Sequence, residues 1–206
     1  MIIRFATAWR CVAAAAAVVT LLLAACGQEP VRRPTAGTHI ICFGDSLTAG
    51  TGASEGMDYP AQLSRRLGKD VINAGVPGDT TADGLSRLKD DVLDQSPRLV
   101  LITLGGNDLK NGVSRETAFA NLRQIVDRIH ATGAVAVIGG IHIPFYGRGY
   151  GEAYQQLATE TGAVLIESIL DDIMGDRALM SDPIHPNDAG YAIMAERFQE
   201  AIRPLL

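Results

Sequence analysis

Five short, mostly apolar runs separated by segments with helical spacing constrain the fold of this chain most. The runs are residues 39–43, 71–73, 98–104, 134–139 and 163–166. Their apolar residues follow one another instead of alternating with polar ones, which is typical of strands covered on both faces. We therefore predict a mainly parallel, five-stranded sheet with right-handed crossovers, placed between two layers of helices.

The segments between the runs repeat apolar residues every three to four positions. This spacing indicates helices that bury one face. We expect helices over 58–67, 85–92, 118–129 and 191–202. The result is an α/β fold, a three-layer α/β/α sandwich of flavodoxin-like type. Ligands of such sheets bind at the carboxyl ends of the strands, so the loops that follow the strands are expected to hold the chemistry.

The first 25 residues differ from the rest, because only four of them are not apolar. Arg4 and Arg10 are followed by an apolar stretch, residues 11–25, broken only by Thr20. A membrane span needs about 20 residues, so this stretch favours a secretory signal peptide. Its end, LAAC with Cys26 last, resembles the lipobox of bacterial lipoproteins, in which the cysteine thiol carries diacylglycerol.

Three domain segments follow from this interpretation: a signal peptide over 1–25, a flexible tether over 26–38 and a folded domain over 39–206. We expect an exported protein held at the periplasmic face of the outer membrane through a lipidated Cys26. Ordinary cleavage, giving a soluble periplasmic or secreted protein, and an uncleaved anchor are the alternatives.

Charge, cysteine content and the absence of ligand motifs in the sequence bear on binding to nucleic acid, on disulfides and on cofactors. The formal net charge is −5, which argues against binding to a nucleic-acid backbone. Cys42 is the one cysteine left once Cys11 is cleaved off and Cys26 is lipidated, so we expect no internal disulfide and a small core residue at this position. No residue cluster has metal-ligand spacing and no glycine-rich phosphate loop follows a strand, so we expect no metal and no cofactor.

Four loops carry polar motifs in a fixed order along the chain. They are GDSL at 44–47, Gly78 in the loop after the second run, GGND at 105–108 and DPIH at 182–185. Each alone also fits an ordinary turn or helix cap. Together they resemble the SGNH/GDSL hydrolases, and most of all the multifunctional periplasmic thioesterase/lysophospholipase/arylesterase group. The resemblance spans residues 39 to about 205.

Ester hydrolysis requires a nucleophile, a base, a group that orients the base and donors for the oxyanion. Ser46 is the expected nucleophile, His185 the base and Asp182 the group that orients the imidazole. The resemblance assigns the oxyanion hole to the backbone N–H groups of Ser46 and Gly78 and to the side-chain amide of Asn107.

The walls of the substrate pocket are less constrained by these motifs. Candidates are Leu109, His142 and Tyr146, and Gly75 competes with Gly78 for the second oxyanion donor. The segment 141–147 is one residue shorter than is usual in the group that the chain resembles, which bears on the shape of this wall.

These residues predict a serine esterase that hydrolyses acyl esters, with thioesters or lysophospholipids as further substrates, through an acyl-enzyme intermediate. An acyltransferase or a carbohydrate deacetylase of the cell envelope would use the same triad. A tethered binding module without activity is the alternative from another class. The substrate is thus expected to be an acyl ester or a lipid, and the sequence leaves its acyl length and its leaving group open.

Overall fold

The computed structural model describes residues 32–142, 147 and 149–206. The predicted signal peptide, Cys26 and the pocket candidate Tyr146 lie outside the described residues. Within the predicted tether, the amide of Thr35 donates to the carbonyl of Gly133 at 2.9 Å and that of Thr38 to the carbonyl of Ser96 at 3.0 Å. Backbone contacts with the folded domain therefore begin before the expected boundary at residue 39.

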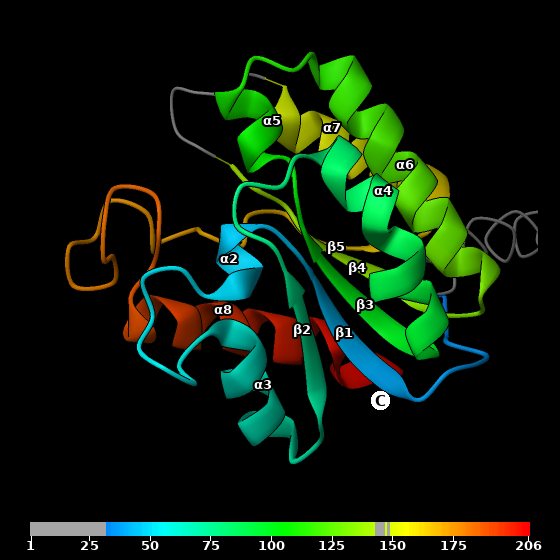
Figure 1. Ribbon diagram of the computed structural model, residues 1–206, viewed down its shortest axis with the longest axis horizontal. Helices are drawn as coiled ribbons and strands as arrows, with labels where there is room; N and C mark the ends of the chain where they lie inside the picture. The colour runs from blue at the N-terminus through cyan, green and yellow to red at the C-terminus, as the bar shows by residue number, and fades with distance from the viewer. Residues whose placement is uncertain (1–31, 143–146, 148) are drawn as a thin grey trace, which may run out of the picture. The chain divides into compact units, whose positions relative to one another are not determined.

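The sheet has five parallel strands in the order β2-β1-β3-β4-β5 (Figure 1). The strands are β1 (His39–Gly44), β2 (Val71–Gly75), β3 (Pro97–Thr103), β4 (Val135–Gly139) and β5 (Val164–Ile166). Each of the five predicted runs is confirmed as a strand. In this flavodoxin-like order, β2 is added on one side of β1, and β3, β4 and β5 are added on the other side. The point between β1 and β3 is therefore a topological switch point, where doubly wound sheets bind their ligands.

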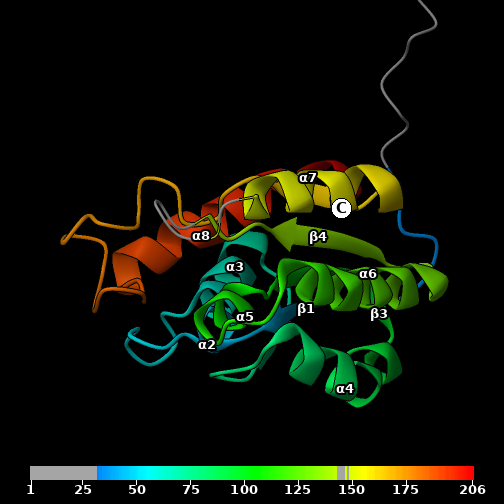
Figure 2. The same ribbon diagram turned by 90° about the horizontal axis from the view of Figure 1, so that it is seen from above.

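Helices cover both faces of the sheet, as predicted. They are α2 (Ser46–Ala49), α3 (Tyr59–Leu67), α4 (Thr81–Asp91), α5 (Gly106–Lys110), α6 (Arg115–Ala131), α7 (Tyr150–Thr161) and α8 (Asp188–Ile202), with short 3₁₀ turns at Leu93–Gln95 and Arg203–Leu205. Figures 1 and 2 show α4 and α6 on one side of the sheet and α3 and α8 on the other. The predicted helices over 58–67, 85–92, 118–129 and 191–202 are confirmed.

The continuous apolar runs are explained by burial on both faces. Along β1, Ile41 and Phe43 pack in the cluster formed with α4, α6 and α7, whereas Ile40 and Cys42 pack in the cluster formed with α3 and α8. Cys42 is fully buried and carries a free thiol, in agreement with its expected place in the core.

Helix α7 was not among the predicted helices. Its residues Tyr150, Tyr154 and Leu157 are buried, and the Tyr150 ring meets the ring of Phe119 edge-on at 5.3 Å. The helices α3, α4, α6 and α8 each begin at a side chain that accepts a backbone N–H, whereas α7 begins at Gly149 without such a cap. The start signal that marks the other long helices in the sequence is therefore missing here.

Within the described ranges, no helix combines the length and the apolar character needed to cross a bilayer.

Candidate active site

The candidate residues converge at the carboxyl edge of the sheet. Ser46 follows β1, Gly78 follows β2 and Asn107 follows β3. The long loop before α8, drawn in orange in Figure 1, reaches the same end of the sheet and carries Asp182 and His185. The site therefore lies beside the switch point between β1 and β3.

Ser46, His185 and Asp182 form a continuous chain of hydrogen bonds. Ser46 Oγ lies 3.0 Å from His185 Nε2, and His185 Nδ1 lies 2.7 Å from Asp182 Oδ2. With the imidazole proton on Nδ1, the serine hydroxyl donates to Nε2 and the Nδ1–H donates to the carboxylate. This arrangement lets the imidazole take the serine proton while the carboxylate holds the ring in that tautomer.

Backbone N–H groups of the same turn hold the side chain of Asp182 in place. Its Oδ1 accepts the backbone N–H groups of Ile184 and His185, both at 2.8 Å. The hydrogen bond from His185 and these backbone donors lower the pKa of Asp182 to about 2. The side chain is therefore a carboxylate across the neutral pH range and favours a positive charge on the neighbouring imidazole.

Ser46 is placed at the first position of the short helix α2. Asp45 caps this helix, because its Oδ1 accepts the N–H of Leu47 at 3.0 Å. Gly44 lets the ends of β1 and β3 approach closely, because a Cβ atom there would lie 2.3 Å from the carbonyl oxygen of Thr103. The GDS sequence thus holds the serine hydroxyl out from the end of β1.

Gly78 adopts the backbone conformation of a tight turn. Its φ of 91° is left-handed, and the N–H of Asp79 donates to the carbonyl of Val76 at 3.2 Å. Pro77 followed by a left-handed Gly78 is the pattern of a type II turn. A Cβ at Gly78 would meet nothing within 4 Å, so this exposed backbone leaves open space for a substrate.

Gly75, the rival candidate, is engaged elsewhere. Its N–H donates to Asn73 Oδ1 at 3.0 Å, and a Cβ there would lie 2.2 Å from the backbone nitrogen of Ala49. The glycine at this position permits β2 to pack against α2, and the N–H group is not free for an oxyanion. The geometry favours Gly78 over Gly75.

Asn107, in the loop after β3, contacts the loops that follow β1 and β2. Its Nδ2 donates to the carbonyl oxygen of Asp79 at 3.0 Å and approaches Asp45 Oδ2 at 3.3 Å. Asp45 is buried, at 3% exposed, and this burial raises the pKa of its carboxyl to about 7. The contacts with Asp79 and Asp45 fix the carboxamide of Asn107 at the start of α5.

An apolar pocket of about 440 Å³ adjoins these residues. Asp45 and Asn107 contribute to its wall. The apolar lining consists of Leu47, Leu109, Ile141, Leu170, Met174 and Ile184. The structure thus places the predicted Leu109 in this wall. Leu170 and Met174 come from the irregular segment after β5, which carries no motif, so sequence reasoning missed them.

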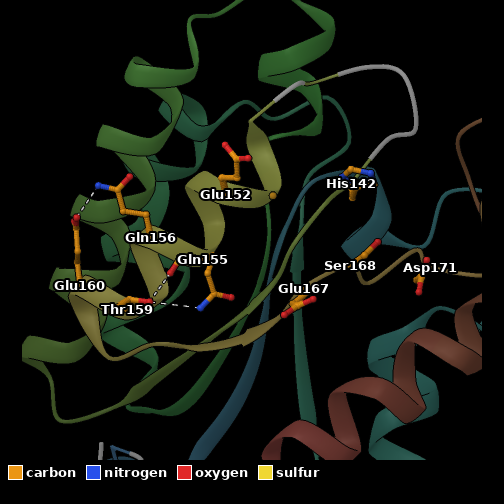
Figure 3. A pocket seen from close by; sticks show the side chains of 10 residues that line it. His142, Glu152, Gln155, Gln156, Thr159, Glu160, Glu167, Ser168 and Asp171 are labelled. Atoms are coloured by element: carbon orange, nitrogen blue, oxygen red, sulfur yellow. Dashed lines mark hydrogen bonds between the residues drawn. The ribbon is translucent and has the colours of Figure 1, made fainter.

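His142 lies in a different cavity. That cavity has a volume of about 800 Å³ and shares no lining residue with the apolar pocket. Figure 3 shows His142 near Ser168 and Asp171, across from the polar side chains of α7 such as Gln155 and Glu152. His142 therefore lines a different cavity from Leu109, the other described pocket candidate. Among the described residues, no group of three His, Cys, Asp or Glu side chains is placed to hold a metal ion.

This fold and this set of loops define a class of enzyme. A model of the GDSL-like lipase/acylhydrolase family matches residues 42–193, and the chain belongs to this family, as the sequence motifs indicated. It is a carboxylic ester hydrolase of the α/β type.

The chain is similar to particular members of this family. Thioesterase 1/protease 1/lysophospholipase L1 of Escherichia coli (strain K12) is 32% identical over 182 residues, which cover 84% of this chain and 88% of that protein. The arylesterase of Vibrio mimicus is 34% identical over 173 residues, covering 78% and 86%. The crystal structure of TesA is 32% identical, with a TM-score of 0.77 over 82% of this chain and all (100%) of that chain.

Proposed function

We propose that this protein hydrolyses acyl esters through a covalent acyl-enzyme on Ser46. His185 acts as the general base and Asp182 orients it. The observation that carries the proposal is the pair of hydrogen bonds that join Ser46 Oγ to His185 Nε2 at 3.0 Å and His185 Nδ1 to Asp182 Oδ2 at 2.7 Å.

In the first half of the reaction, Ser46 Oγ bonds to the carbonyl carbon of the ester and its proton moves to His185 Nε2. The carbonyl oxygen becomes an oxyanion, which accepts hydrogen bonds from the N–H groups of Ser46 and Gly78 and from Asn107 Nδ2. When the tetrahedral intermediate collapses, the bond to the leaving group breaks and the imidazolium returns the proton to that group.

In the second half, water replaces the leaving group. His185 Nε2 takes a proton from the water, and the hydroxide bonds to the acyl carbon. Collapse of this second intermediate breaks the bond to Ser46 Oγ, which recovers the proton from His185. The carboxylate of Asp182 stabilises the imidazolium in both halves.

The apolar pocket supports an acyl chain as the part of the substrate that is recognised. Its lining by Leu47, Leu109, Leu170 and Met174 would bury methylene groups, each contributing about 0.8 kcal/mol. For p-nitrophenyl esters we expect kcat/KM to rise about fourfold per added methylene until the pocket is filled. A flat profile from acetate to octanoate would contradict this role of the pocket.

The size of the pocket bears on the alternatives. An acetyl group would leave most of a 440 Å³ apolar pocket unfilled, which favours a longer acyl chain over the substrate of a carbohydrate deacetylase. Thioesters and lysophospholipids come within the proposal because they too present an acyl carbonyl, and the names of the Escherichia coli relative include both activities. Product analysis with added alcohols separates hydrolysis from acyl transfer, since only a transferase yields mainly the new ester.

The nucleophile is tested by Ser46→Ala. We expect this variant to lose at least about a thousandfold in kcat and to resist labelling by a fluorophosphonate. Ser64→Ala is the matched control, because within the described part of the chain the Ser64 hydroxyl bonds only to the carbonyl of Lys69, at 2.7 Å, near the C-terminal end of α3. Labelling of another serine, or activity retained in Ser46→Ala, would refute the assignment.

We further propose that the mature protein begins at a lipidated Cys26, after removal of residues 1–25, and that residues 26–38 link the anchor to the hydrolase domain. The support is the LAAC sequence that ends the apolar stretch. Such an anchor would hold the enzyme at the periplasmic face of the outer membrane, beside ester-bearing lipids.

A further inference from the structure

Arg87, on α4, makes an unusual set of contacts at the carboxyl edge of the sheet. Its Nε donates to Asp79 Oδ2 at 2.6 Å, its Nη1 to the carbonyl of Ala74 at 2.9 Å and its Nη2 to the carbonyl of Gly44 at 2.9 Å. Nη1 also donates to Asp91 Oδ2 at 2.8 Å, one turn further along the same helix. One side chain therefore joins the end of β1, the end of β2 and the loop that follows β2.

The environment of Arg87 requires a guanidinium. The side chain is only 17% exposed and its terminal carbon lies 4.4 Å from the centre of the Phe43 ring. The planar fork reaches acceptors in several directions at once, whereas a lysine carries all its donors on one nitrogen and cannot reproduce the set.

The groups held by Arg87 adjoin both proposed backbone donors. Gly44 ends β1 and stands two residues before Ser46, and Asp79 comes directly after Gly78. The carboxylate of Asp79 is 11% exposed and is held by Arg87 in a salt bridge. Because the Gly78 turn and the turn into α2 belong to separate loops, their N–H groups point at one substrate atom only if both loops keep their relative positions.

The third proposed donor depends on the same groups. Asn107 Nδ2 donates to the backbone carbonyl of Asp79 at 3.0 Å, so the orientation of the carboxamide follows the position of that residue. The Arg87–Asp79 ion pair thus lies one covalent or hydrogen-bonded step from Gly78 and from Asn107. His185 and Asp182 come from the loop before α8, and none of the hydrogen bonds of Arg87 reaches that loop.

We propose that Arg87 is the positioning residue of the oxyanion hole: it holds the loops after β1 and β2 directly, and the loop after β3 through Asp79, so that their donors converge. This rests on the proposed esterase function. Donors that are already aligned in the free enzyme need no rearrangement when charge develops on the carbonyl oxygen, and misplacement by about 1 Å costs on the order of a hundredfold in rate.

The test is the pair of variants Arg87→Lys and Asp79→Asn, which break the ion pair from either side while keeping a polar side chain. We expect kcat per active site to fall between about tenfold and a hundredfold, with KM within about threefold of the wild type. The inhibition constant of a trifluoromethyl ketone, whose adduct carries an oxyanion, should rise by the same factor. The pH profile of kcat/KM should keep its midpoint, because His185 and Asp182 are not touched.

Asp91→Asn is the matched control. It removes the negative charge that pairs with Arg87 on α4, at a side chain that is 41% exposed, and leaves the bonds to the loops in place, so kcat should stay within about twofold of the wild type. Active-site titration with a fluorophosphonate counts only competent molecules. A loss of folded protein alone would lower the titre and leave kcat per titrated site unchanged.

A wild-type kcat per titrated site in Arg87→Lys and Asp79→Asn would overturn the inference, and so would an equal loss in Asp91→Asn. Neither would affect the proposed function, which is tested separately by the activity of Ser46→Ala and by the serine that the fluorophosphonate labels. A shift in the pH midpoint of Arg87→Lys would also count against it, because the effect would then act on the base and not on the oxyanion donors.

Discussion

Replacing Asn107 by alanine tests the side-chain donor of the proposed oxyanion hole. The amide makes two contacts, with the carbonyl of Asp79 at 3.0 Å and with Asp45 Oδ2 at 3.3 Å. An amide NH₂ group has two hydrogens, so an oxyanion would take the N–H that makes the longer contact with Asp45 Oδ2, while the bond to the Asp79 carbonyl keeps the amide in place. Asn107→Ala removes the donor and adds no charge and no bulk.

The expected effect on the rate follows from the loss of one donor out of three. One such hydrogen bond is worth about 3 kcal/mol in the transition state, which corresponds to a fall in kcat of about 160-fold. The ground-state carbonyl is bound mainly through the acyl chain, so KM should change by less than about threefold. The two lost contacts lower the free energy of unfolding by about 1 kcal/mol each, a shift in Tm of a few degrees that leaves the protein folded at 25 °C.

The assay is turnover of a soluble p-nitrophenyl ester per titrated active site. Asn121→Ala is the control, because the Asn121 amide donates to Thr81 Oγ1 at 3.1 Å, between α6 and the start of α4, and has no part in the site. We expect a wild-type kcat in this variant. If Asn107→Ala keeps more than about a third of the wild-type kcat, the side chain is not an oxyanion donor.

Three further perturbations have defined outcomes. Asp182→Asn would keep an acceptor for the two backbone N–H groups but turn an NH₂ group towards His185 Nδ1. The imidazole would then carry its proton on Nε2 and could not accept the serine proton, so kcat/KM should fall about 10³- to 10⁴-fold. A loss below tenfold would contradict this role of Asp182. Burial raises the pKa of Asp45 to about 7, against about 3.9 in an unfolded chain. Between about pH 4 and 7, the Asp45 carboxyl therefore stays protonated in the folded protein but is ionised in the unfolded chain. As the pH rises from about 4 to 7, this difference lowers the free energy of unfolding. Urea titrations of Asp45→Asn should show this slope reduced, by up to about 4 kcal/mol over the window, and an unchanged slope would place the proton elsewhere. Cys26→Ser should move the protein from the membrane fraction to the soluble fraction with kcat on a soluble ester unchanged, and a mature N-terminus without lipid in the wild type would exclude the anchor.

The sequence determined the layers of the fold because a strand that is buried on both faces must consist of consecutive apolar residues. A strand such as β1, with Ile40 to Phe43 all buried, must be apolar at every position, and the amphipathic helices must repeat apolar residues at helical spacing. Where a local signal was weak, as at the uncapped start of α7, the prediction failed. The motifs also indicated which residues to examine, because serine, histidine, aspartate and asparagine in loops after parallel strands have few purely structural reasons to occur together.

Only the tertiary structure decided which of these groups meet. Ser46 and His185 are 139 residues apart in the chain, and their contact depends on the path of every strand between them. The sequence already favoured Gly78 over Gly75, and the packing of β2 on α2 adds that the Gly75 N–H is engaged elsewhere. The surroundings of Arg87, Leu170 and Met174 are visible only with the loops in place. Local sequence records whether a residue is buried and which backbone it can adopt, but a contact between distant segments is a property of the whole folded chain.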